Sequence, residues 1–76
     1  MTTIYLKVDA GKTITIPSVA TDAFINFGIY GGGTVIIEGD VTTATLHTAD
    51  DTTITINGKL NGQRGEIGSK TTILGS

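Results

Sequence analysis

Apolar and polar residues alternate along most of this chain, and a period of two predicts half-buried β-strands. Near the start, Ile4, Leu6 and Val8 fall on one face of such a strand. The same alternation recurs in the segments 13–16, 25–29, 35–37 and 54–56. The 15 Thr and 11 Ile residues favour strands, and the 11 Gly residues disfavour helices. The sequence therefore predicts an all-β protein, in which only residues 17–23 could form a short helical turn.

A weak internal repeat divides the chain into strand, tight turn and strand. Its anchor positions are Thr13, Thr34, Thr53 and Thr72, which are spaced 21, 19 and 19 residues apart. A short turn rich in Gly or Asp precedes each anchor, in the segments 9–12, 31–33, 49–51 and 68–70. The polar, glycine-rich stretch 61–66 is expected to be an exposed loop. The unit is thus repeated about four times, and residues 1–76 form a single β domain.

Two architectures fit this unit. Turns of three or four residues that contain Gly suit antiparallel hairpins, which would close into a small antiparallel barrel or sandwich. A period of about 20 residues without helices also suits a short β-solenoid. Solenoids usually keep a stricter length per coil, whereas the first unit here is longer and contains Pro17. The sequence therefore favours the antiparallel arrangement and leaves the solenoid as the alternative.

The chain is short for a protein that folds alone. A chain of 76 residues buries a small fraction of its surface, and such chains are usually supported by disulfides, a metal or a partner. There is no Cys, which excludes disulfides, and a single His cannot complete a zinc site. Support from other copies or from another protein remains, so we expect a homo-oligomer or a component of a larger assembly.

Charge and hydropathy exclude several classes of partner. The five basic residues are scattered and the net charge is −2, so no basic stripe for nucleic acid exists. The longest purely apolar run, 35–37, is too short to cross a membrane, and the N-terminus lacks the pattern of a signal peptide. Only 16% of the residues are charged, which favours a large contact surface with neighbouring chains. The sequence predicts a cytoplasmic site of synthesis and no membrane partner.

No arrangement of side chains predicts catalysis or a cofactor. His47 alternates with the apolar Leu46 and so points to the polar face, while Asp50 and Asp51 fall in a turn, where Asp commonly bonds to nearby backbone N–H groups. The glycine run 31–33 leads into a strand, whereas phosphate-binding loops lead into a helix. The protein is therefore predicted not to be an enzyme.

Several apolar residues are predicted to point outward. Ile36 occupies the repeat position at which Thr15 and Thr55 stand in other copies. Three aromatic residues also fall opposite the inward residues of their strands, namely Tyr5, Phe24 and Tyr30. Exposed apolar and aromatic side chains on a small domain indicate contacts with another chain. We therefore predict Ile36, Tyr5, Tyr30 and Phe24 as interface residues.

Paired hydroxyls suggest another kind of surface. Thr13 and Thr15 share one face of a strand, as do Thr53 and Thr55, and stacked Thr-x-Thr ladders on a flat solenoid can bind ice. The segment 35–37 interrupts this ladder in the second copy. A ligand-binding or ice-binding module is therefore retained only as a lesser alternative.

The overall composition and residue pattern resemble those of two groups of structural proteins. Short, cysteine-free chains rich in Thr, Gly and Ile resemble bacteriophage virion components, especially head-decoration (cement) proteins and tail-fibre pieces. This resemblance implies a trimer that attaches to a capsid lattice, assembled in the host cytoplasm as part of the virion. The segments 35–41 and 56–60 also resemble coils of bactofilin-type cytoskeletal solenoids, which polymerise end to end. The predicted function is thus a non-enzymatic virion structural protein, with a self-polymerising cytoplasmic solenoid as the alternative.

Overall fold

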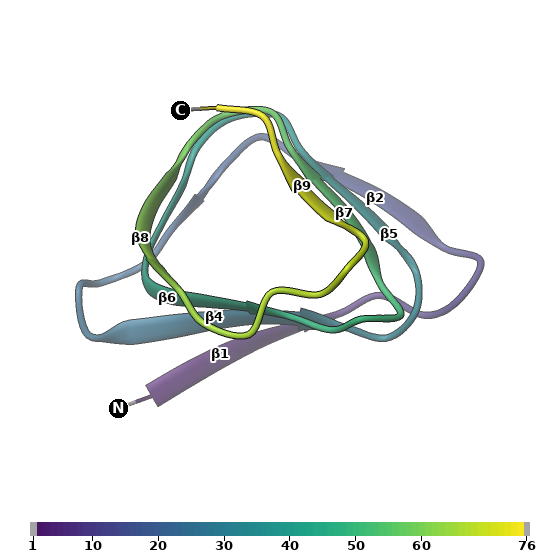
Figure 1. Ribbon diagram of the computed structural model, residues 1–76, viewed down its shortest axis with the longest axis horizontal. Coiled ribbons are helices and arrows are strands. Elements are labelled where there is room, and N and C mark those ends of the chain that lie inside the picture. Colours follow the sequence, from purple (N-terminus) through teal and green to yellow (C-terminus); the bar gives the residue numbers. More distant parts are fainter. Residues whose placement is uncertain (1, 76) are drawn as a thin grey trace.

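The computed structural model describes residues 2–75, which wind into a β-solenoid of about four coils (Figure 1). The prediction of an all-β chain is confirmed, and residues 17–23 contain a short strand in place of the helical turn. In chain order the strands are β1 (Thr2–Lys7), β2 (Thr13–Ile16), β3 (Val19–Ala20), β4 (Ile25–Tyr30), β5 (Thr34–Ile37), β6 (Val41–Thr48), β7 (Thr53–Ile56), β8 (Leu60–Arg64) and β9 (Thr71–Ile73).

Each strand pairs with the strand one coil further along the chain, and all of these pairings are parallel. The favoured antiparallel barrel or sandwich is therefore wrong, and the solenoid alternative is the fold. Within residues 2–75 the antiparallel pairing is limited to an isolated bridge between Asp9 and Gly32. The glycine-containing turns do not reverse the chain onto the preceding strand. They bend it around a corner, so the next strand lies on a different side of the coil.

The coil has three sides, visible down the axis in Figure 1. The first side holds β1, β4 and the later part of β6, where residues 46–48 pair with β4. The second side is a four-stranded sheet in the order β2-β5-β7-β9. The third side holds β3, the first part of β6 and β8. Residues 61–66 are exposed as expected, but 61–64 belong to strand β8 where a loop was predicted. The shortest dimension of the chain, 20 Å, matches four strands spaced about 4.8 Å apart.

The core is built from side chains that stack in columns along the coil axis. On the second side the two inward columns are Ile14, Val35, Ile54 and Thr71, and Ile16, Ile37, Ile56 and Ile73. The four members in the middle coils, Val35, Ile37, Ile54 and Ile56, are completely buried. Leu46, Ile29 and Phe27 on the first side extend the same core. Apolar burial between the coils is thus the main stabilising contribution to the fold.

The fourth coil is shorter than the repeat predicted. Ile54 pairs with Thr71, so the coil-to-coil offset on the second side falls to 17 residues from 21 and 19 in the earlier coils. Thr72 is therefore the counterpart of Thr55, not of Thr53. This register keeps Ile73 beside Ile56 inside the coil. It also turns Thr71 inward, where its hydroxyl lies 2.8 Å from that of Thr48.

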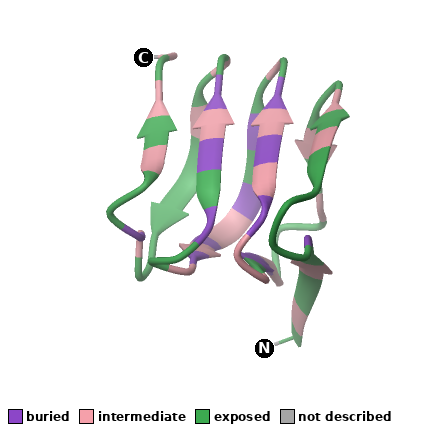
Figure 2. Cartoon of the chain, turned by 90° about the vertical axis from the view of Figure 1, so that its right-hand side faces the viewer, coloured by how far each residue is buried: buried purple, intermediate pink, exposed green. Residues whose placement is uncertain are grey.

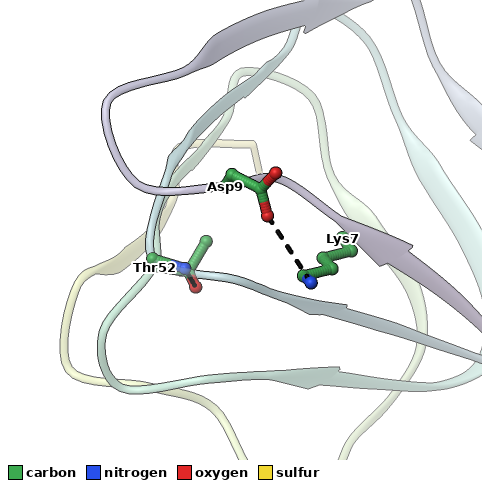
Figure 3. Close-up of polar contacts among 4 residues, drawn as sticks. Lys7, Asp9 and Thr52 are labelled. Carbon is green, nitrogen blue, oxygen red and sulfur yellow. Dashed lines mark hydrogen bonds and ion pairs between the residues drawn. The ribbon is translucent and has the colours of Figure 1, made fainter.

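Polar side chains join the coils at the corners, where the backbone ladder is interrupted. Thr52 is fully buried, accepts a 3.0 Å hydrogen bond from the Gly32 N–H and donates to Asp51. The carboxylates of Asp40 and Asp50 accept backbone N–H groups 19 residues further along the chain. The ion pair between Lys7 and Asp9, 3.6 Å long, is exposed and contributes little to stability (Figure 3).

Candidate functional surfaces

Both ends of the coil expose part of the apolar core. Val35, Ile37, Ile54 and Ile56 in the middle coils have no exposed surface, whereas their column neighbours in the first and last coils are only partly buried. Figure 2 shows this gradient, with buried residues in the inner strands and partly buried or exposed residues in the outer ones. The partly buried residues that pack against the core are Leu6, Ile14, Ile16, Val19, Leu60, Ile67 and Ile73.

The first coil also presents an unpaired backbone edge. The carbonyls of Lys12 and Ile16 accept the N–H groups of Thr34 and Glu38, each at 2.9 Å. Backbone groups of successive residues point to opposite sides of a strand. The N–H and C=O groups of Thr13 and Thr15 therefore point away from β5, towards the open side of β2. Within residues 2–75 no strand covers this edge.

The last coil presents the complementary edge. Ile54 donates its N–H to the carbonyl of Lys70, and Leu74 donates to that of Ile56. The backbone of Ile73, between these bonded positions, faces away from β7. In the part of the chain that the structure describes, β9 has no partner on this side. The chain thus carries a parallel strand edge at each end, and the two edges face in opposite directions along the axis.

The outer surface of the second side is rich in threonine. Its outward residues, in register across the four strands, are Thr13, Thr15, Thr34, Ile36, Thr53, Thr55 and Thr72. Ile36 lies between Thr15 and Thr55 and is half-buried. The segment 17–23 does not fold over it, because Val19 and Ala20 pair with β6 on the third side.

The four predicted interface residues lie on different parts of the surface. Tyr5 and Tyr30 are neighbours on the first side, with ring centroids 5.8 Å apart and ring planes at 88°. Ile36 lies on the second side, and Phe24 lies in the turn between β3 and β4 with 77% of its surface exposed. One flat contact could include Tyr5 and Tyr30 together, but it could not include Ile36 as well. The predicted trimeric or lattice contact thus has no single apolar patch that unites its residues.

His47 takes part in the cross-coil bonding. Its Nδ1 atom accepts the backbone N–H of Glu66 at 3.2 Å. The neighbouring Asp50 is engaged with the Ser69 N–H at 3.1 Å and belongs to the following corner. Among residues 2–75, no three His, Asp or Glu side chains gather in a way that could hold a metal ion.

Sequence reasoning did not bring His47 and Glu66 together with the two tyrosines. Gly28, His47 and Glu66 follow one another at intervals of 19 residues, close to the length of one coil. That spacing could have placed them side by side on the first side of a solenoid.

No relative of this chain was found among known proteins. No family model, curated protein or solved structure matches this chain. In the described part of the chain, no helix is long and apolar enough to cross a membrane.

Proposed function

We propose that this protein is a structural unit whose copies stack head to tail, so that the last coil of one copy pairs with the first coil of the next. The observation that supports this proposal is the contrast between the fully buried Ile and Val columns of the middle coils and their only partly buried continuations at both ends. Repeat proteins need polar terminal caps to remain soluble as single units. Neither end of the described chain has such a cap.

The two ends match when the strand register is continued across the contact between two stacked copies, here called the joint. Thr71 and Ile73 of one copy would stand beside Ile14 and Ile16 of the next, which places Ile73 against Ile16. The outward Thr72 would stand beside Thr15, in line with the threonine column. Apolar groups thus meet apolar groups, and hydroxyls meet hydroxyls.

Two contributions would stabilise the joint, namely strand pairing and the burial of apolar side chains. Added strand pairing satisfies the open backbone groups of β2 and β9, as in other cases of strand addition. Full burial of an Ile side chain contributes about 1.5–3 kcal/mol, and two are only partly buried at each end, Ile14 and Ile16 in the first coil and Ile67 and Ile73 in the last. Because the two surfaces of the joint differ, the contact does not close on itself as a twofold dimer does. It repeats into a filament.

Stacking is tested by removing one backbone donor at the open edge of β2. Pro at position 15 has no N–H, and the Thr15 side chain lies outside the core, so Thr15→Pro leaves the β2–β5 ladder and the core intact. We expect this variant to sediment as a 7.8 kDa monomer with its β circular dichroism retained, while the unmodified chain forms larger species.

The matched control is Thr15→Ala, which alters the same side chain and keeps the N–H group. It should assemble like the unmodified chain. Assembly of Thr15→Pro to the same size as Thr15→Ala would contradict stacking through β2.

A further inference from the structure

The first side of the coil carries a shallow groove of about 330 Å³ on its outer surface. It is lined by side chains from successive coils, including Thr3, Tyr5, Tyr30, His47 and Glu66. Its volume lies near the lower limit of small-ligand pockets, which begin at about 300 Å³. The groove runs from the first coil to the last on the outer face of the first side, whereas stacking uses the strand edges at the two ends, so its role does not depend on the stacking proposed above.

Two tyrosine rings form the apolar wall of the groove. Tyr5 and Tyr30 meet edge to face, with their centroids 5.8 Å apart. Gly28, on the strand between Tyr5 and His47, makes this arrangement possible. A Cβ atom at position 28 would come within 2.8 Å of two carbon atoms of the Tyr5 ring. The lack of a side chain there lets the ring lie against the sheet, with 66% of Tyr5 still exposed.

Hydrogen-bonding side chains also line the groove, namely Thr3, His47 and Glu66. Because His47 Nδ1 accepts the Glu66 N–H, the neutral ring carries its proton on Nε2 and can donate from there. Within residues 2–75 the one ion pair joins Lys7 to Asp9, so the Glu66 carboxylate can accept hydrogen bonds from a ligand. The hydroxyl of Thr3 can both donate and accept.

This combination fits a saccharide. A sugar ring presents an apolar C–H face that stacks on an aromatic ring, and hydroxyls around its rim that both donate and accept hydrogen bonds. Quaternary ammonium ligands are typically held in aromatic cages, in which several ring faces converge on the cation. In an edge-to-face pair, the edge of one ring already covers part of the face of the other. We therefore propose that the groove formed by Tyr5, Tyr30, His47 and Glu66 binds a short neutral oligosaccharide.

The test is an NMR titration of the ¹⁵N-labelled Thr15→Pro chain, which is expected to be a monomer, with maltotriose, cellotriose and triacetylchitotriose at millimolar concentrations; the substitutions below are made in the same background. At least one sugar should shift the amide signals of Gly28, His47 and Glu66 in a saturable way. Tyr30→Ala and the isosteric Glu66→Gln should each weaken that binding about tenfold, which corresponds to about 1.4 kcal/mol. Phe24→Ala, which removes an exposed aromatic residue outside the groove, should leave the affinity unchanged.

Three results would overturn the proposal. The first is that none of the three sugars shifts these signals. The second is a shift that persists unchanged in both Tyr30→Ala and Glu66→Gln. The third is that choline chloride saturates the same residues more tightly than any of the sugars, which would make the groove a cation site.

Discussion

Replacing Ile54 by alanine is expected to unfold the chain. Ile54 lies in the inward column of the second side and is completely buried between Val35 and Thr71. Truncation of a buried Ile to Ala typically costs about 2–5 kcal/mol, because apolar contacts are lost and a cavity remains. Small domains have a total free energy of unfolding of about 5–15 kcal/mol, and a chain this short lies at the lower end. Thermal unfolding followed by circular dichroism would measure the loss.

The neighbouring residue provides the control for this prediction. Thr53 belongs to the same strand but points outward and is exposed. Thr53→Ala should change the free energy of unfolding by no more than about 0.5 kcal/mol, as exposed substitutions usually do. Equal losses from Ile54→Ala and Thr53→Ala would contradict the assignment of inward and outward residues.

Gly31→Ala is expected to have a comparably large effect, through the backbone and not through the core. Gly31 has a φ angle of +118°, which L-residues with a side chain rarely adopt. A Cβ atom there would also lie 2.5 Å from the carbonyl oxygen of Val8, in the preceding coil. This oxygen accepts the Gly33 N–H, so it cannot move away without loss of that bond. We expect a destabilisation of more than about 4 kcal/mol. Few single substitutions have so large an effect.

Gly11→Ala would separate the free-energy cost of a positive φ angle from the cost of steric crowding. Its φ angle is +82°, but a Cβ atom added there would meet no atom within 4 Å beyond its own chain neighbours. Gly11→Ala should therefore cost only the conformational term, about 1–2 kcal/mol. Urea unfolding of both variants would measure the difference. Similar midpoints for the two would show that the corner at Gly31 is not closely packed against Val8.

The alternation of residues was enough to predict the strands and the inward residues of the middle coils. It was not enough to predict how the strands pair. The run 31–33 can close a hairpin or turn a corner, because both need glycines with positive φ, and a side-chain period of two is the same in parallel and antiparallel sheets. The register of the last coil was also missed. Aligning Thr72 with Thr53 preserves the Thr-Ile pattern, but the structure instead places Ile73 beside Ile56.

Some features of the surface could also be predicted from the sequence, and others could not. That Tyr5 and Tyr30 are exposed followed from their place in the strands, and the structure finds both exposed. Their contact with each other and their nearness to His47 depend on which strands are neighbours, and that required the solenoid. The open ends were likewise invisible, because an antiparallel barrel has no first and last coil.

The most direct test of head-to-tail stacking is a disulfide between two copies. The chain has no Cys, so Thr15→Cys and Thr72→Cys can be prepared as separate variants, each with one thiol. In a continued register these positions would lie on neighbouring strands about 4.8 Å apart, inside the range of about 4.4–6.8 Å that disulfides span. Mild oxidation of an equal mixture, followed by tryptic digestion and mass spectrometry of the disulfide-linked peptides, should give mainly the disulfide between positions 15 and 72. Formation of the three possible disulfides in random proportions, or an excess of 15–15 and 72–72 pairs, would contradict the stacking of coil on coil.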